Sequence, residues 1–330
     1  MKTYDATTPP AVAVPAARVR GRGARRRPVP LFAYLCLLPA VAFAGVFLYY
    51  PTLSALYHAF TDWDGVNAAN FVGLANFQQM FSDTQMRQSF LNGIEITVVT
   101  LILELIVPLT VAKMILALRN QRMQHLIRLL FVFPLIVPQV IIYLLWLFIY
   151  DPNVGLLNAT LDLLHLGFLK HDWLGDPGTA LYAVMATGAG IISFFPFVDG
   201  FGLLIYTAGL QAIPAEIIES AQLDGAGWWR RFWRVEFPLI LGQLRLMSVL
   251  TITSSVQLAA VTAIVVLTGG GPGFATYIPG FSMYYNAFYY NHMGYACAIG
   301  TVLFLFVLVL TILNLRFVRP SLEFDAGGRS

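Results

Sequence analysis

Glu219-Ser-Ala-Gln-Leu-Asp-Gly-Ala226 is the most strongly patterned stretch of the chain, and its setting indicates the fold. It lies in a polar segment, residues 211–242, between two long apolar runs, and Phe232 and Phe237-Pro238 follow it. Apolar runs of this length are typical of membrane-spanning helices. A membrane protein that keeps such a segment in water between two spans is expected to present it to a partner protein.

Local signals in the segment predict two helices joined by a tight turn. Pro214 suits the first turn of a helix, where its missing N–H is not needed. Good helix formers occupy 215–223, and Gly225 permits the left-handed backbone that ends a helix. A second helix is expected over 228–235, and Pro238 begins the return to the membrane. The small residues that would let another protein approach closely are Ser220, Ala221, Gly225 and Ala226.

A second interpretation of the segment is an amphipathic loop that lies on the lipid surface. Trp228, Trp229 and Trp233 suit such a position, because Trp is enriched where the membrane meets water. The two interpretations differ in what covers the segment, which is a protein in the first and lipid headgroups in the second.

Composition places the chain among integral membrane proteins. Of its 330 residues 58% are hydrophobic and 11% are charged, whereas soluble domains carry about 25% charged residues. A span needs about 20 apolar residues to cross ~30 Å of hydrocarbon. Six blocks qualify, namely 31–50, 91–112, 129–150, 181–206, 246–267 and 293–315. Because backbone amides must be paired internally in lipid, each block is predicted to be a helix. Pro134 and Pro138 are expected to kink the third helix rather than break it.

The distribution of Lys and Arg orients these helices. With the N-terminus in the cytoplasm, all but Arg87 and Lys170 of the 20 basic residues lie on the cytoplasmic side, as the positive-inside rule requires. The predicted fold is an all-α integral membrane protein with six transmembrane helices, both termini inside and a cytoplasmic helix-turn-helix at 211–242. A disordered basic tail is expected over 1–29, the six-span domain over 30–318 and a C-terminal tail over 319–330.

The N-terminal region has two other interpretations. Residues 1–42 have the layout of a signal peptide, but the apolar run continues to Tyr50, beyond a usual signal core. An Arg-rich tail can also bind nucleic acid, but here the basic residues are explained as topology determinants. We therefore expect an uncleaved first span and no nucleic-acid partner.

The segment 219–238 resembles the EAA loop of permease subunits in bacterial ABC importers. That loop reads Glu-Ala-Ala, two further residues and Asp-Gly-Ala, and then an aromatic residue and Leu-Pro. Here Ser220 replaces the first Ala and Phe237 replaces the Leu. The resemblance implies that the segment docks onto an ATPase subunit and transmits its movement. The residues that carry this coupling role are Glu219, Ser220, Ala221, Asp224, Gly225, Ala226, Phe232 and Pro238.

Further stretches resemble the first permease subunit of carbohydrate importers of the maltose and glycerol-3-phosphate type. Phe71-Val-Gly-Leu-Ala-Asn-Phe77 follows the first span, and Leu267-Thr-Gly-Gly-Gly-Pro-Gly273 follows the fifth. Thr276, Tyr285-Asn-Ala-Phe288 and Gly294-Tyr-Ala-Cys-Ala298 complete the pattern. Each stretch alone is also typical of an ordinary loop, but together the resemblances cover about residues 30–318, which is nearly the whole chain.

The resemblance implies a defined set of partners. They are a second homologous permease, two ATPase subunits, an external substrate-binding protein, a carbohydrate and the lipid of the bacterial inner membrane. ATP and Mg²⁺ would be bound by the ATPase subunits, so no cofactor is expected on this chain. It has no G-x-x-x-x-G-K-[ST] motif and no nucleophile–base arrangement, and we expect no catalytic residue. Cys36 and Cys297 are expected to pack as small apolar residues, and no metal-ligand spacing is present.

Three acidic residues, Glu95, Glu104 and Asp199, lie within predicted spans. A charge in the bilayer core costs at least ~2.5 kcal/mol, so such residues usually face a cavity or a partner. They can hydrogen-bond sugar hydroxyls, hold neighbouring helices together or relay protons. The last use defines the alternative function, a proton-coupled secondary transporter that needs no ATPase. A membrane scaffold without transport activity is a third hypothesis.

The resemblance places the substrate path at the middle of the fourth and fifth spans. Aromatic side chains there can stack on sugar C–H surfaces, and hydroxyl groups can hydrogen-bond sugar hydroxyls. The same residue types are also typical of plain helix packing. The candidates are Phe194, Phe195, Phe197, Asp199, Thr251, Ser254, Ser255 and Gln257. Because no Lys or Arg lies deep in a span, a phosphorylated or carboxylated substrate is not expected unless the second permease supplies the charge.

Overall fold

The computed structural model describes residues 31–187, 193–194, 198–256 and 258–318. The predicted tails, 1–29 and 319–330, therefore lie outside the described residues. The chain divides into two units, Met1–Pro51 and Thr52–Ser330, and each is described by itself.

The described part of the first unit is helical and apolar. Helix α1 (Leu31–Ala44) is followed by η1 (Gly45–Tyr49), a π-helical turn, and then by α2 (Tyr50–His58), which contains the boundary between the units. The stretch Tyr34–His58 is 25 residues long and apolar enough to cross a membrane. Its length and composition agree with the predicted first span.

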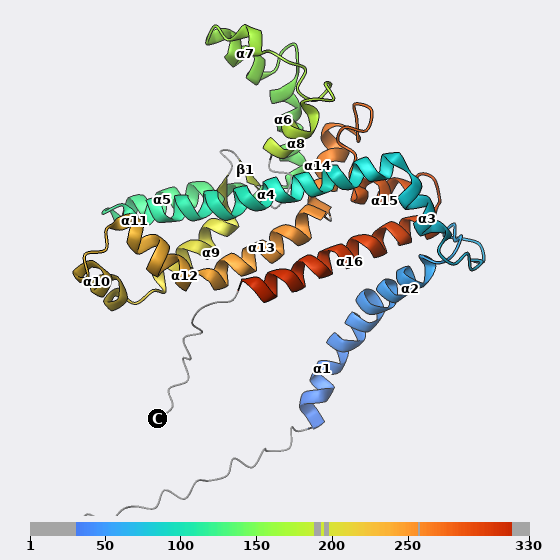
Figure 1. Ribbon diagram of the computed structural model, residues 1–330, viewed down its shortest axis with the longest axis horizontal. Helices are drawn as coiled ribbons and strands as arrows, with labels where there is room; N and C mark the ends of the chain where they lie inside the picture. Colours follow the sequence, from blue (N-terminus) through green and yellow to red (C-terminus); the bar gives the residue numbers. More distant parts are fainter. Residues whose placement is uncertain (1–30, 188–192, 195–197, 257, 319–330) are drawn as a thin grey trace, which may run out of the picture. The chain divides into compact units, whose positions relative to one another are not determined.

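The second unit is built around three long apolar helices. They are α4 (Thr84–Ala117), α13 (Leu241–Val256) with its continuation α14 (Leu258–Leu267), and α16 (Met293–Phe317). Helix α4 begins where the Asp83 side chain accepts a hydrogen bond from the backbone N–H of Gln85, which satisfies one of the unpaired amides of its first turn. Figure 1 shows α4, α13 and α16 running roughly side by side through the unit. These helices agree with the second, fifth and sixth predicted spans.

The third predicted span is broken rather than kinked, so that expectation was wrong. Helix α5 (Gln121–Val132) and the 3-10 turn η2 (Phe133–Ile136) end at Val137, and α6 (Gln139–Tyr150) starts after Pro138. The two helical pieces are bent by 97°. Val137 is extended, with φ −79° and ψ 127°, because the residue before a proline is disfavoured in the helical region.

The fourth predicted span, 181–206, is also not one helix. Helix α8 (Ala180–Ala186) ends early, and strands β1 (Ser193–Phe194) and β2 (Val198–Asp199) form a short antiparallel pair. Helix α9 (Gly200–Gln211) then starts afresh. At Gly200 an added Cβ would lie 2.5 Å from the backbone oxygen of Phe131, so a residue without a side chain is needed where α9 packs against α5.

Among the described residues, the structure has four continuous helices that could cross a membrane, or up to six if each bent pair counts as one span. The second bent pair is α9 with α10 (Ala215–Leu223), which meet at 69°. The remaining helical elements are α3 (Ala75–Ser82), α7 (Leu156–Leu163), η3 (Gly167–Leu169), α11 (Trp228–Arg231), η4 (Phe232–Glu236), α12 (Phe237–Leu239) and α15 (Pro279–Phe288).

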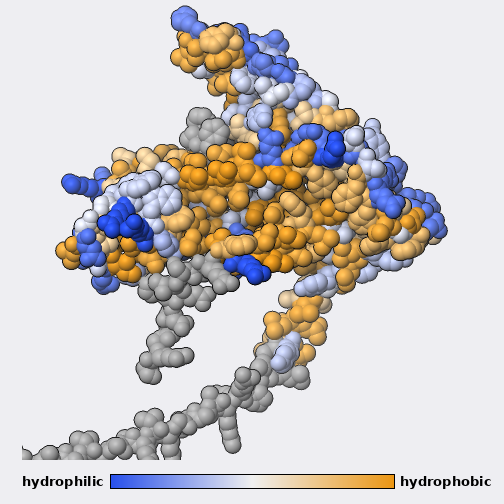
Figure 2. Space-filling model, in the orientation of Figure 1, coloured by the Kyte–Doolittle hydropathy of each residue, from blue (hydrophilic) through white to orange (hydrophobic). Residues whose placement is uncertain are grey.

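The surface of the second unit is strongly apolar over its long helices. Figure 2 shows a broad hydrophobic area there, with hydrophilic residues gathered where α10–α11 and the loops beside α3 lie. Ile106 of α4 and Val309 of α16 are both more than half exposed. An apolar surface of this extent is expected to be covered by lipid or by another protein.

One buried cluster matters for the candidate site, and we call it the α4–α9–α13 cluster. It holds together the C-terminal half of α4, helix α9 and the start of α13. Its buried members are Leu109, Ala112, Ile115, Val198, Leu203, Tyr206, Leu210, Ile240, Leu244 and Met247. The segment 211–242 connects two of these helices and packs part of itself against the cluster.

Candidate functional site

Helix α10 ends in a turn whose backbone bonds explain why the sequence needs a glycine there. The N–H of Ala226 donates to the oxygen of Ala221, and the N–H of Gly225 donates to the oxygen of Gln222, both at 3.0 Å. This pair of bonds is the Schellman arrangement, which requires a left-handed residue just after the helix. Gly225 supplies it with φ +74°.

The predicted contact residues of α10 are brought together on an exposed surface. Glu219, Ser220, Asp224 and Gly225 are exposed, while Ala221 and Ala226 are half-buried in the turn. No residue of α10 is buried. Nothing lies within 4 Å of a Cβ added at Gly225, so this turn is open to the approach of another surface.

The following stretch, α11 to α12, faces inward instead. Phe232 and Phe237 pack against the α4–α9–α13 cluster, and their rings lie 6.2 Å apart. Pro238 is the second residue of α12 and is half-buried. Trp228, Trp229 and Trp233 remain about half exposed. Of the predicted contact residues, Phe232 and Pro238 therefore hold the base of the segment, whereas those of α10 face outward.

An ion-pair cluster that the sequence analysis missed fixes this base to the longest helix. The Glu236 carboxylate accepts from Lys113 Nζ through Oε2 and from Arg231 Nε through Oε1, the latter at 2.9 Å. The Glu236 side chain is only 3% exposed, and those of Lys113 and Arg231 are 15% and 18% exposed. Lys113 Nζ also lies 5.9 Å from the ring centre of Phe232, within the range of a cation–π contact.

The sequence contains a weak signal for this cluster. Glu236 is a single acidic residue beside three nearby arginines, and it stands next to Phe237-Pro238. Lys113 closes the second apolar block. Their pairing joins positions 123 residues apart, which no local pattern reveals.

Asp199, a candidate for the substrate path, caps a helix. Its Oδ1 accepts from the N–H of Phe201 at 3.0 Å and its Oδ2 from the N–H of Gly202 at 2.6 Å. The side chain is 1% exposed. These are the bonds of an N-cap, which satisfies the unpaired amides at the start of α9. Among the interpretations of this acid, the structural one has direct support.

The hydroxyl candidates of α13 bond within their own helix, and one of them, Thr251, also bonds α4. Ser254 and Ser255 both donate to the oxygen of Thr251, at 3.0 and 2.7 Å. The Thr251 hydroxyl lies 2.9 Å from the oxygen of Met247 and 2.7 Å from Glu104 Oε2. Glu104 thereby links α4 to α13. The carboxylate of Glu95 bonds the hydroxyl of Tyr182, so both acids of α4 contact neighbouring helices.

Three other substrate-path candidates, Phe195, Phe197 and Gln257, lie outside the described residues, and Phe194 is described only as part of β1.

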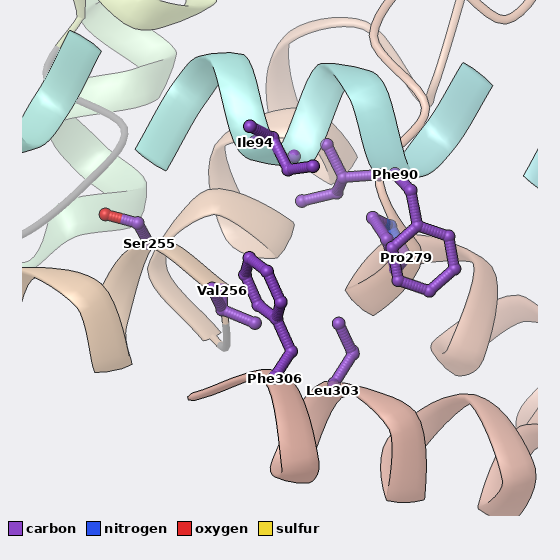
Figure 3. A pocket seen from close by; sticks show the side chains of 9 residues that line it. Phe90, Ile94, Ser255, Val256, Pro279, Leu303 and Phe306 are labelled. Carbon is purple, nitrogen blue, oxygen red and sulfur yellow. The ribbon is translucent and has the colours of Figure 1, made fainter. Parts of the chain in front are cut away.

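Near Ser255, a cavity of about 20 Å³ is bordered by Phe90, Ile94, Pro279, Leu303 and Phe306 (Figure 3). The Ser255 hydroxyl points away from these apolar side chains. A space of this size holds about one water molecule, so it is no sugar site as it stands.

The Gly-rich loop between α14 and α15 is also held by α4. The side-chain amide of Asn92 donates to the oxygens of Phe274, Ala275 and Tyr277, at 3.2, 3.0 and 2.9 Å. Asn92 is 3% exposed, and its own oxygen accepts from Gln88 at 2.9 Å. Within the loop, the hydroxyls of Thr268 and Thr276 lie 2.7 Å apart. The loop is therefore ordered by α4 at one end of that helix.

Comparison with known proteins agrees with this architecture. Residues 105–320 match the family described as "Binding-protein-dependent transport system inner membrane component". A probable ABC transporter permease protein of Pyrococcus horikoshii is 33% identical over 289 residues, which cover 87% of this chain and 96% of the relative. The permease protein UgpA of the sn-glycerol-3-phosphate transport system of Agrobacterium fabrum is 30% identical over 300 residues, covering 90% and 98%.

A solved structure shares the fold. It is the crystal structure of a bacterial alginate ABC transporter in complex with an alginate pentasaccharide-bound periplasmic protein. One of its chains superposes with a TM-score of 0.75 over 88% of this chain and 94% of that chain, at 19% identity. At this identity the likeness concerns the fold alone.

Proposed function

Because this chain belongs to the family of binding-protein-dependent transport system inner membrane components, we propose that it is the permease subunit of an ATP-driven importer of a sugar or oligosaccharide. The observation that carries the proposal is the exposed surface of α10 and its turn, where Glu219, Asp224 and Gly225 face solvent. A short helix with no buried residue is suited to dock into a groove of another protein.

In this proposal α10 docks on a partner ATPase subunit. Glu219 supplies an acceptor to the ATPase groove, and Asp224 and Gly225 set the turn that shapes the docking surface. Binding of ATP and Mg²⁺ by the ATPase subunits closes their dimer, and α10 moves with it. Phe232 and Pro238 hold the base of the segment on the bundle, so the movement reaches the membrane helices. The result is alternating access, driven mechanically.

The proposed topology has six spans with both termini in the cytoplasm of a bacterial cell, and the chain lies in the inner membrane. Four continuous apolar helices and the bent pair of α5 and α6 supply five of these spans, and the block 181–206, which contains α8 and the start of α9, is the proposed sixth. Segment 211–242 then lies in the cytoplasm with Arg230, Arg231 and Arg234, in agreement with the positive-inside rule. The Gly-rich loop held by Asn92 lies on the opposite side, where an external binding protein would deliver the substrate.

The proposed substrate is an uncharged carbohydrate. The apolar blocks lack Lys and Arg in their interior, and such cations would be the natural partners of a phosphate or carboxylate group. The cavity beside Ser255 is too small for a sugar, so passage along this face would need the helices to move apart. A second homologous permease would form the other half of the path.

The first test is a pull-down of the tagged protein from detergent-solubilised native membranes, followed by mass spectrometry. We expect an ATPase and a second permease to be recovered with it. Reconstituted with them and with the binding protein, the complex should take up sugar only when ATP is supplied. A chain recovered alone, which transports on a proton gradient without ATP, would refute the proposal and support the proton-coupled alternative.

A further inference from the structure

Helix α4 makes polar contacts with other parts of the second unit near both of its ends and between them, and three of these contacts carry the argument. Asn92 holds the Gly-rich loop, Glu104 holds α13 through Thr251, and Lys113 holds the base of segment 211–242 through Glu236. We propose that α4 is the helix that transmits movement through the permease, and that the cluster Lys113–Glu236–Arg231 is its permanent inner joint. This inference rests on the coupling role proposed above for α10.

The geometry of α4 suits a helix that connects the two sides of a membrane. Asn92 and Lys113 are 21 residues apart in one helix. At a rise of 1.5 Å per residue, this separation corresponds to about 31 Å, close to the thickness of the hydrocarbon layer. Figure 1 shows α4 extending from the region of α3 and α15 to the region of α11 and α12. Helix α4 is continuous between these two residues, although Pro108 lies inside it, so a movement of one end can be passed along it to the other.

The inner joint combines three interactions at one point. Glu236 is buried between a cation from α4 and a cation from α11, and the Lys113 ammonium also lies over the Phe232 ring. A buried carboxylate that loses a partner is left with an uncompensated charge, so such a cluster resists opening far more than a surface ion pair does. Phe232 and Phe237 add apolar contacts with the α4–α9–α13 cluster.

These contacts give the two halves of segment 211–242 different roles in transmitting movement. Helix α10 has no buried residue and is the half that can receive a push from a partner. The half from α11 to α12 is fixed to α4 by Glu236 and the two phenylalanines. We expect this second half and the inner end of α4 to move as one body in every step of the cycle.

A cross-link across the joint tests its permanence. In a background with Cys36→Ser and Cys297→Ser, Lys113→Cys and Glu236→Cys would be joined by a short bis-methanethiosulfonate reagent. The cross-linked complex is expected to recover most of the transport per ATP that the unlinked double variant has lost. If cross-linking instead abolishes transport, and reduction of the linker restores it, the joint must open during the cycle and the proposal is wrong.

A single substitution tests whether the joint transmits movement. Glu236→Gln keeps the shape of the side chain but removes its charge, and we expect the sugar transported per ATP hydrolysed to fall by roughly tenfold while ATP hydrolysis continues. The matched control is Asp162→Asn, which removes the acid of an exposed ion pair with Lys170 at 2.8 Å. That variant should behave like the unmodified protein.

The amount of each variant in the membrane and its recovery with the ATPase are measured in parallel. If Glu236→Gln assembles normally and keeps full coupling, the joint has no transmitting role, although the importer assignment stands. If the unmodified protein itself shows no ATP-dependent uptake with its partners, the proposed function fails instead. The two failures are therefore distinguishable.

Discussion

From the sequence, Asp199 is consistent with both a transport role and a structural role, whereas the structure gives direct evidence for the structural role. An acid in an apolar block suggests substrate or proton binding, but here both carboxylate oxygens accept backbone N–H groups at the start of α9. The charge is therefore placed where the positive end of a helix dipole stabilises it. Its first role is to begin α9 after a broken span.

Substitution of Asp199 separates these roles. Asp199→Asn keeps an oxygen that can cap the helix, so we expect unfolding in detergent close to that of the unmodified protein and retained uptake. Asp199→Ala loses the cap and should lower the free energy of unfolding by about 1 kcal/mol or somewhat more. The measurement is chemical denaturation followed by circular dichroism. Loss of uptake in the stable Asn variant would instead indicate that the charge takes part in transport.

Gly225 carries a prediction that isolates backbone geometry. Both Gly225 and Gly227 have open space around an added Cβ, but only Gly225 has a positive φ. Gly225→Ala should therefore strain the turn by about 1–2 kcal/mol, distort the docking surface of α10 and reduce ATP-driven uptake severalfold. Gly227→Ala is the matched control and should leave uptake unchanged. Equal effects of the two substitutions would show that turn geometry is not what matters.

At the scale of elements, the sequence predicted the long helices well and the broken ones badly. Helix α10 has the predicted bounds, 215–223, and α16 begins at the predicted Met293. Hydropathy measures only how apolar a block is, so it cannot distinguish one helix from two helices that meet inside a bundle. The sequence does contain signals that these two spans are broken. Pro138 disfavours a helical conformation at Val137, which is extended, and Asp199 is a typical N-cap residue directly before the first residue of α9.

The polar contacts between elements could not have been predicted. Glu236 pairs with Lys113, and Asn92 bonds residues more than 180 positions away. Such contacts follow from the packing of helices in three dimensions and leave no periodicity in the sequence. The residues of α10 that are predicted to couple, by contrast, lie on one short helix and its turn, so their spacing in the sequence was enough to group them.

The Gly-rich loop provides a prediction at this scale. Asn92→Asp keeps the shape of the side chain but exchanges its N–H donors for acceptors, which would face three carbonyl oxygens. Because buried groups that lose their partner cost about 1–3 kcal/mol each, we expect the loop to detach. Amide hydrogen exchange over 268–278 should become faster.

The control for this variant is Thr97→Val on the same helix. Thr97 donates only to the oxygen of Gly93 within α4, so its loss should leave exchange in the loop unchanged. Unchanged exchange in Asn92→Asp would show that the loop is held by its own internal bonds, such as the contact between Thr268 and Thr276.

At the scale of the whole molecule, the described residues place all three clusters of buried side chains in the second unit. The most apolar part of the helical stretch Tyr34–His58 contains no buried residue. Its large apolar side chains, such as Phe47 and Tyr50, are 71% exposed. An apolar span with so little of its surface buried is expected to face lipid or a second subunit.

Replacement of this span tests that expectation while keeping the topology. Residues 31–50 would be exchanged for an equally long run of Leu and Ala, which still crosses the membrane. We expect the thermal unfolding midpoint of the isolated chain to stay the same, while recovery of the second permease in the pull-down falls. A clear drop in the unfolding midpoint would mean that the first span stabilises the second unit directly.

The way α10 stands apart from the rest of the chain also bears on how such proteins can diversify. Helix α10 has no buried residue. The stretch from Trp228 onward, in contrast, contacts α4 and the α4–α9–α13 cluster through Glu236, Phe232 and Phe237. Under the proposed function, residues 215–227 can therefore change to fit a different ATPase subunit with little effect on the buried clusters. If α10 docks on an ATPase subunit as proposed, an exchange of this segment between permeases should end at Gly227, because one that extends to Glu236 separates this carboxylate from Lys113 on α4.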